Sequence, residues 1–188
     1  MGNSISKKTK NNLNYSELFP SKSILENKED YEELEHLGHG ILREVFQGNF
    51  SSPIQNILLD PNAKILDVGC GTGFWLIEMA SDFQKPNYFG IDILPIFPKS
   101  TFPSNIEFQQ GNVLEGLPFE DNTFDFIHMQ FLFCELTVFQ WENFIFQEIA
   151  RVLKPGGWLE ICDPELEIIN KGPMTKKFDM AGKYTVYI

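Results

Sequence analysis

Apolar and polar residues alternate in blocks along the chain, and these blocks predict strands and helices in turn. Short apolar runs predict strands at 64–68, 88–93, 105–109, 124–130 and 158–162. Apolar residues at helical spacing predict helices over about 27–47, 74–83 and 138–153, and Pro155-Gly156-Gly157 predicts a turn before the last strand. Because alternating strands and helices build a parallel sheet with helices on its faces, we predict an α/β fold with a doubly wound, mostly parallel sheet.

The chain divides into a basic arm and one acidic domain. Residues 1–22 are polar, rich in Asn, Ser and Lys, and without periodicity, so we expect a disordered arm. Residues 23–188 form the domain: a cover helix at about 27–47, a core at 64–163 and a short tail at 164–188. The arm carries a net charge of +3, within a total of -11 over 188 residues.

Composition narrows the class of protein. The net charge of -11 repels the phosphate backbone of nucleic acids, so we do not expect nucleic acid as a partner. No apolar run approaches the roughly 18 residues of a membrane span, and the first residues do not resemble a secretory leader. The three cysteines, Cys70, Cys134 and Cys162, have no CxxC spacing. They therefore predict reduced thiols in a cytoplasmic protein rather than a disulfide framework or zinc site.

A second potential metal-ligand set lies in the cover helix. Glu32, His36 and His39 share one helical face, but no further His or Cys stands nearby. This pattern favours a solvated face, and we expect no metal site. His128 lies inside the apolar run at 124–130, where we expect a core histidine with a hydrogen-bond partner.

A glycine-rich turn follows the first strand. The segment ILDVGCGTG at 65–73 places glycine at every second position after Asp67. Such glycines let a ligand lie against bare backbone at the start of a helix. A nicotinamide fingerprint, GxGxxG, would need glycine where Phe74 stands. Asp67 would repel a pyrophosphate, but it suits a ligand that carries an ammonium group.

A second acid, Asp92, ends the next strand, 19 residues after Gly73. An acid there can accept hydrogen bonds from ribose hydroxyls, although a turn residue would also fit this position. A nucleoside joined to a cationic amino acid would satisfy both Asp67 and Asp92. S-adenosylmethionine is such a molecule, and we predict it as the cofactor.

Four ordered segments then extend this prediction to a family. ILDVGCGTG, GIDI, GNVLEGLPFEDNTFDFIHMQ and EIARVLKPGGWLEI, within 64–163, resemble the class I S-adenosylmethionine-dependent methyltransferases in order and spacing. EHLGHGILREVFQGNFSSPI and DILPIFP resemble fungal-type members. Similar proteins often carry a histidine near the cofactor cover at the place of His39, so this resemblance implies a lid role as the alternative to a solvated face. The resemblance implies a Rossmann-like fold and methyl transfer to an unidentified small-molecule or protein acceptor. The alternative is a non-catalytic cofactor-binding or scaffold protein.

The resemblance also implies roles for individual residues. Asp67 would hold the amino group of the methionine portion, and Asp92 the ribose. Backbone contacts would come from Gly69, Cys70 and Gly71, close helix packing from Gly73, an adenine contact from Ile93, and carbonyls near the methionine end from Met129 and Gln130.

Asn112 and Val113 follow the third strand, where the family usually has an acid that binds the adenine amino group. The amide oxygen of Asn112 can accept the same hydrogen bond, or the residue can be a turn former beside Gly111. No residue is assigned as a catalytic base.

Family members usually have seven strands, whereas residues 164–188 offer one short strand near 184–188. We therefore expect a sheet that lacks most of the last two strands, either because the chain is shortened at its carboxyl end or because a partner chain completes the sheet. The fifth strand would be an exposed apolar edge, through which copies of the chain could self-associate.

The amino terminus, MGNSIS, matches M-G-x-x-x-[ST] with Lys7, Lys8 and Lys10 directly after it. Gly2 would then be myristoylated, and the acyl chain with the basic patch would attach the protein to membranes. An unmodified polar leader fits the same residues equally well.

Overall fold

The computed structural model describes residues 28–132 and 135–163. The elements in chain order are α2 (Lys28–Phe46), α3 (Gln55–Leu58), β1 (Lys64–Val68), α4 (Phe74–Asp82), β2 (Asn87–Asp92), β3 (Ile106–Gln110), the 3-10 helix η2 (Val113–Glu115), β4 (Phe124–Gln130), α5 (Val138–Gln140), the π-helix η3 (Trp141–Ile145), α6 (Phe146–Val152) and β5 (Leu153–Cys162). The predictions for Gly2, the basic arm, Cys134 and the tail from residue 164 lie outside these residues.

All five strands run parallel, in the order β3-β2-β1-β4-β5. The predicted α/β fold with a doubly wound sheet is therefore confirmed. β1 and β4 are buried almost throughout, which explains why both are continuous apolar runs in the sequence. The chain moves outward in opposite directions from the β1–β4 pair. Open α/β sheets bind ligands outside the carboxyl ends of the strands at such a switch point.

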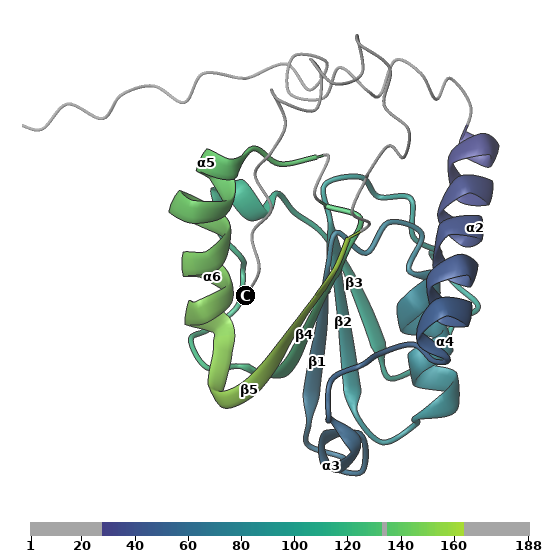
Figure 1. Ribbon diagram of the computed structural model, residues 1–188. Helices are drawn as coiled ribbons and strands as arrows, with labels where there is room; N and C mark the ends of the chain where they lie inside the picture. The colour runs from purple at the N-terminus through teal and green to yellow at the C-terminus, as the bar shows by residue number, and fades with distance from the viewer. Residues whose placement is uncertain (1–27, 133–134, 164–188) are drawn as a thin grey trace, which may run out of the picture.

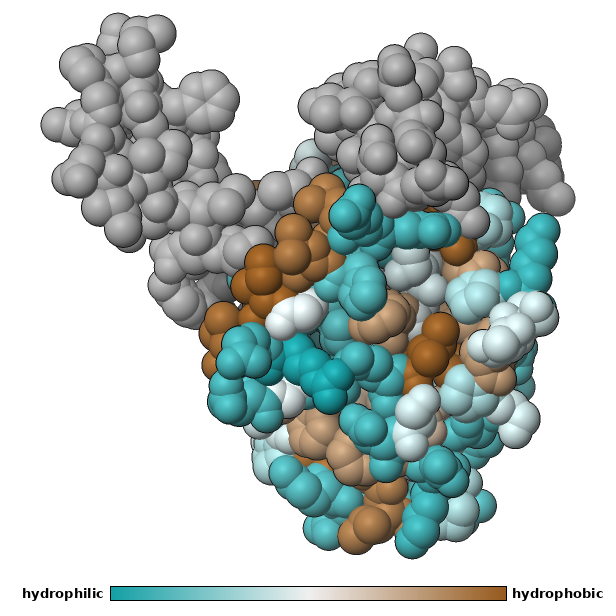
Figure 2. All heavy atoms as spheres, turned by 90° about the vertical axis from the view of Figure 1, so that its right-hand side faces the viewer, coloured by the Kyte–Doolittle hydropathy of each residue, from teal (hydrophilic) through white to brown (hydrophobic). Residues whose placement is uncertain are grey.

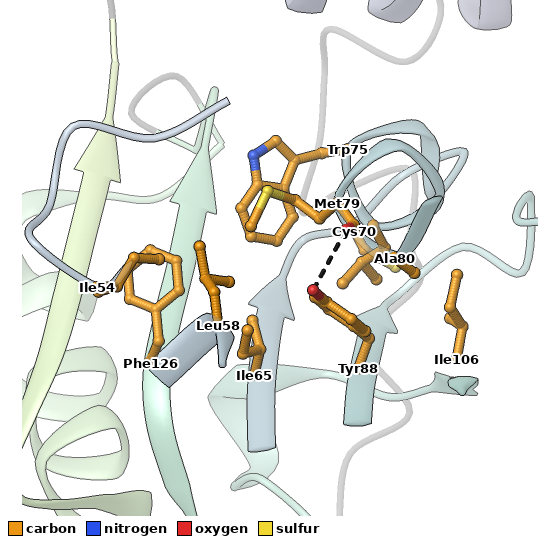
Figure 3. Close-up of a cluster of buried hydrophobic side chains, with 11 residues drawn as sticks. Ile54, Leu58, Ile65, Cys70, Trp75, Met79, Ala80, Tyr88, Ile106 and Phe126 are labelled. Carbon is orange, nitrogen blue, oxygen red and sulfur yellow. Dashed lines mark hydrogen bonds between the residues drawn. The ribbon is translucent and has the colours of Figure 1, made fainter. Parts of the chain in front are cut away.

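Helices cover both faces of the sheet (Figure 1). α5, η3 and α6 lie over one face, whereas α4 and then α2 lie over the other. Each face buries its own apolar cluster. Figure 3 shows the cluster beneath α4, where the Tyr88 hydroxyl donates to the Met79 carbonyl oxygen at 3.2 Å. The two clusters hold β1 and β2 in place, and the loops that follow these strands are positioned with them.

The end of the sequence-predicted fold differs in detail. A turn was expected at 155–157 before the last strand, but β5 already begins at Leu153. Phe124 pairs with Leu153 and Phe126 with Trp158, so the proline and glycines form a bulge within the strand. The helix predicted over 138–153 contains the π-helical turn η3 and ends at Val152. The short helices α3 and η2 were not predicted.

β5 is the outermost strand on its side of the described sheet. Trp158 on this strand is 44% exposed. Self-association through this edge stays a prediction. Within the described ranges, no helix has the length and apolarity that a membrane span requires.

An ion-pair cluster ties α6 to the loop before β4. Arg151 donates to Glu148 at 2.7 and 3.0 Å and to the backbone carbonyls of Leu117 and Phe119. Glu148 also accepts the Leu117 N–H at 2.8 Å. The hydrogen bonds from Arg151, followed by that from Leu117, hold the pKa of Glu148 below its usual value. The ionised carboxylate is therefore the stabilising form.

We expect Glu148→Gln to lower the free energy of unfolding at pH 7 by about 1 kcal/mol, since the pair is partly exposed. A carboxylate whose folded pKa is depressed stabilises the protein above its unfolded pKa. That contribution is lost as the pH falls through the folded pKa. The difference between the variant and the wild type should therefore shrink below about pH 4.5. Urea unfolding between pH 3 and 8 measures it, with exposed Glu142→Gln as the matched control. A difference that does not change with pH would contradict this account.

Candidate functional site

Backbone hydrogen bonds and two glycines determine the shape of the loop between β1 and α4. Gly69 N–H and Cys70 N–H both donate to the Ile91 carbonyl oxygen, at 2.8 and 3.2 Å, and so fasten the loop to β2. Gly69 has a φ of 75°, and a Cβ there would lie 2.6 Å from the Leu132 side chain. Gly73 has a φ of 74°, and the ring of Phe108 fills the space beside its Cα. A side chain at either position would strain the backbone and displace its neighbour.

Asp92 lies directly against this loop. One carboxylate oxygen accepts the Gly71 N–H at 2.9 Å, and the other accepts the Leu94 N–H at 2.7 Å. These two bonds set the orientation of the carboxylate at the carboxyl end of β2. Because an ionised carboxylate offers about four acceptor positions, the same group can also accept the hydroxyls of a ribose.

Asp67 forms a buried pair with a histidine that is distant in sequence. Its carboxylate lies 2.8 Å from His128 Nδ1, and both side chains are almost completely buried. The ring of Trp75 stacks on the imidazole, with the centroids 3.9 Å apart and the planes 3° apart. The prediction of a satisfied core histidine at 128 is thus confirmed. His128 in turn fixes the direction of the Asp67 carboxylate.

A cleft of about 470 Å³ opens along the carboxyl ends of these strands. That volume lies within the range of sites that hold a small ligand or cofactor. The sequence-predicted residues that line it are Asp67, Gly69, Cys70, Asp92, Ile93, Asn112, Val113 and Gln130. Residues from the ends of four strands, β1, β2, β3 and β4, therefore meet at one cavity.

Three predicted residues do not line the cleft. Gly71 contributes its N–H to Asp92, and Gly73 begins α4. Met129 has its side chain in the core beneath the sheet. Their predicted roles involve backbone groups or close packing. The side chains that line the cleft therefore do not test these roles, which stay predictions.

Asn112 lines the cleft but also caps η2. Its side-chain oxygen accepts the Leu114 N–H at 3.0 Å, which is the turn-forming role that the sequence left open. The contact with an adenine amino group stays a prediction.

The sequence did not identify the contribution of α2. Glu35 accepts the Thr72 N–H at 2.8 Å, so this helix reaches the glycine loop. His39, expected on a solvated face, is instead buried, and its Nε2 lies 3.0 Å from Glu78 Oε2. Helical spacing alone could not reveal these contacts, because they depend on how α2 packs against α4.

The electrostatics of the loop favour a cation. Burial raises the pKa of the Cys70 thiol well above its ordinary value, and the carboxylates of Asp67, Asp92 and Glu35 raise it further. The thiol therefore stays protonated and does not act as a nucleophile. Three carboxylates around one loop suit a ligand with positive charge.

These features fit S-adenosylmethionine. The glycines leave room for a ligand beside the backbone, Asp92 offers ribose acceptors, and the acidic surroundings suit a sulfonium and an ammonium group. A parallel sheet in this order with a glycine-rich loop after β1 is a Rossmann-like arrangement, which class I methyltransferases share.

Comparison with known proteins gives the same class. A family model described as a methyltransferase domain matches residues 65–157. Methyltransferase str2 of Strobilurus tenacellus is 33% identical over 152 residues, which cover 79% of this chain and 52% of that protein. Protein-methionine methyltransferase laeA of Emericella nidulans is 35% identical over 107 residues, covering 56% of this chain and 28% of that protein.

A solved structure shares the fold. It is the phosphoethanolamine N-methyltransferase 2 of Haemonchus contortus, with a TM-score of 0.50 and 22% identity, covering 80% of this chain and 38% of that one. The fold and the comparisons support a class I S-adenosylmethionine-dependent methyltransferase, with S-adenosylmethionine as its cofactor. The chain spans about half the length, or less, of the curated relatives that it matches.

Proposed function

We propose that this chain binds S-adenosylmethionine in the cleft and transfers its methyl group to a small-molecule or protein acceptor. The observation that carries the proposal is the convergence of Asp67, Asp92 and the glycine loop on one cavity. Asp67 and Asp92 lie at the carboxyl ends of β1 and β2, and the glycine loop follows β1. This edge of the sheet is where such a topology binds ligands.

The residues of the chain would act by positioning. Asp92 would bind the ribose, while Asp67, oriented by His128, would face the amino group of the methionine end. The bound cofactor supplies the electrophile, because its sulfonium carries an activated methyl group. The protein then has to align the acceptor with the sulfur–methyl bond and exclude water. No proton transfer is assigned to a side chain.

Two kinds of methyl acceptor are candidates, one suggested by a relative and one by the lining of the cleft. The relative from Emericella nidulans is named as a protein-methionine methyltransferase, which supports including protein side chains among the candidates. The cleft is lined largely by apolar groups such as Phe74, Phe131 and Leu136, which would also accept an apolar small molecule.

Calorimetric titration of the purified chain tests the first part of the proposal. We expect saturable one-site binding of S-adenosylmethionine and no binding of NAD⁺, because Asp67 and Phe74 do not suit a pyrophosphate. Absence of S-adenosylmethionine binding would refute the proposal.

Turnover is a separate measurement. The chain is incubated with methyl-labelled S-adenosylmethionine and a fungal extract divided by size into proteins and small molecules. Methyl transfer should produce S-adenosylhomocysteine and label one of the two fractions. Binding without S-adenosylhomocysteine formation would instead indicate the non-catalytic alternative.

A further inference from the structure

The carboxylate of Glu35 lies on the same loop that the cofactor is proposed to use. Its Oε2 accepts the Thr72 N–H at 2.8 Å, and its carboxylate fills the space beside Gly71 where a Cβ would stand. Glu35 also lines the cleft. A negatively charged group of the protein is therefore placed inside the cofactor site, bound to its backbone.

Backbone N–H groups at the start of a helix bind anions. S-adenosylmethionine carries one anionic group, the carboxylate of its methionine portion, and the loop before α4 offers N–H groups for it. Two of these groups already have carboxylate partners from the protein: Gly71 N–H donates to Asp92, and Thr72 N–H donates to Glu35. Asp92 is fixed at the end of β2, whereas Glu35 belongs to a helix attached from outside the sheet.

α2 is fastened mainly through its carboxyl-terminal half. His39 and Arg43 both contact the carboxylate of Glu78 on α4, at 3.0 and 2.6 Å. Glu35 lies one turn before this attachment, and Gly38 and Gly40 stand between Glu35 and Arg43. Glycine within a helix lowers its stability by about 1 kcal/mol relative to alanine, so the helix is weakest where the two halves join.

The amino-terminal half of α2 also exposes apolar side chains. Figure 2 shows a band of hydrophobic surface on the face that α2 forms, and Leu34 and Leu37 are 57% and 61% exposed. Among the described side chains of this half, Glu35 contacts the loop, and the ring of His36 lies 4.2 Å from that of Phe74.

We propose that Glu35 is an internal competitor for the carboxylate of the cofactor. In the free protein it occupies the Thr72 N–H, and binding of the cofactor displaces it together with the amino-terminal half of α2. In this view α2 is a lid. Without ligand it is held closed by the Glu35 carboxylate, which takes the place of the cofactor carboxylate. This inference rests on the proposed function.

The test compares Glu35→Ala with Glu33→Ala, which removes the same charge from an exposed position two residues away. Both variants and the wild type are titrated calorimetrically with S-adenosylmethionine. A parallel titration uses decarboxylated S-adenosylmethionine, which keeps the sulfonium and ammonium groups but lacks the carboxylate. Loss of the competing anion should make Glu35→Ala bind S-adenosylmethionine about 3- to 10-fold more tightly, which is the range for one typical net hydrogen bond.

The decarboxylated ligand distinguishes competition from general electrostatics. It should bind Glu35→Ala no more tightly than the wild type, and Glu33→Ala should bind both ligands within about twofold of the wild type. Amide exchange without ligand gives an independent readout, since the Thr72 N–H should exchange faster in Glu35→Ala. Glu35→Gln keeps the size of the side chain but weakens the acceptor. Its affinity for S-adenosylmethionine should therefore lie between those of the wild type and Glu35→Ala.

Unchanged or weaker binding of S-adenosylmethionine by Glu35→Ala would overturn the inference. Weaker binding of both ligands would make Glu35 a partner of the cationic part of the cofactor instead. If the wild type binds S-adenosylmethionine and Glu35→Ala binds it no better, only this inference fails. If neither protein binds it, the proposed function fails as well.

Discussion

Replacing Asp92 by alanine is expected to weaken S-adenosylmethionine binding by about 10- to 100-fold, the range for loss of a hydrogen bond to a charged group. Two effects combine in this variant. The proposed acceptor of the ribose hydroxyls is removed, and the Gly71 N–H loses the carboxylate that holds the loop against β2. Calorimetric titration of the variant and the wild type measures the change.

Two controls separate these effects from a general loss of charge. Asp92→Asn keeps one acceptor oxygen, so its affinity should fall less than that of Asp92→Ala. Asp82→Ala removes an exposed acid at the far end of α4 and should bind as the wild type does. Equal affinities of Asp92→Ala and the wild type would refute the ribose assignment.

Replacing His128 by leucine is expected to lower the free energy of unfolding by about 3 kcal/mol. The leucine side chain retains most of the volume but leaves the Asp67 carboxylate buried without the imidazole that lies 2.8 Å from it. Breaking a buried pair by removing one partner typically costs 3–5 kcal/mol, because the remaining charge is not compensated. The stacking contact with Trp75 is lost as well. Urea unfolding at pH 7 measures the difference.

A double-mutant cycle tests whether the two residues act as a pair. Asp67→Leu with His128→Leu should be less destabilised than the sum of the two single variants, since neither partner is then left alone. Glu142→Leu, at an exposed position, should change the free energy of unfolding by less than about 0.5 kcal/mol. Additive effects of Asp67→Leu and His128→Leu would show that no coupled pair exists.

Local sequence patterns predicted most of the sheet. The apolar runs at β1 and β4 were placed at their observed bounds, because strands buried on both faces have a continuous apolar signature. The glycine spacing after Asp67 also predicted the loop before α4. Asp67 and Asp92 could be expected near one another, since the carboxyl ends of parallel strands lie at the same edge of a sheet.

The end of the sheet was less predictable for a local reason. A Pro-Gly-Gly segment is typical of a turn, and the sequence therefore predicted a turn before β5. Here the segment is a bulge, because Leu153 already pairs with Phe124 on the other side of it. Whether such residues end a strand or interrupt it depends on the neighbouring strand, which is distant in sequence.

The sequence by itself therefore determined the α/β fold, the glycine loop and the two acids at strand ends, since each depends on spacing within a few residues. Only the tertiary structure decided which groups control those acids. β4 crosses over to lie beside β1, and the register of these strands places His128 opposite Asp67, 61 residues away. The packing of α2 on α4 likewise brings Glu35 to Thr72 across 37 residues. Neither contact has a local signature, because each is fixed by the burial of apolar faces between elements far apart in the chain.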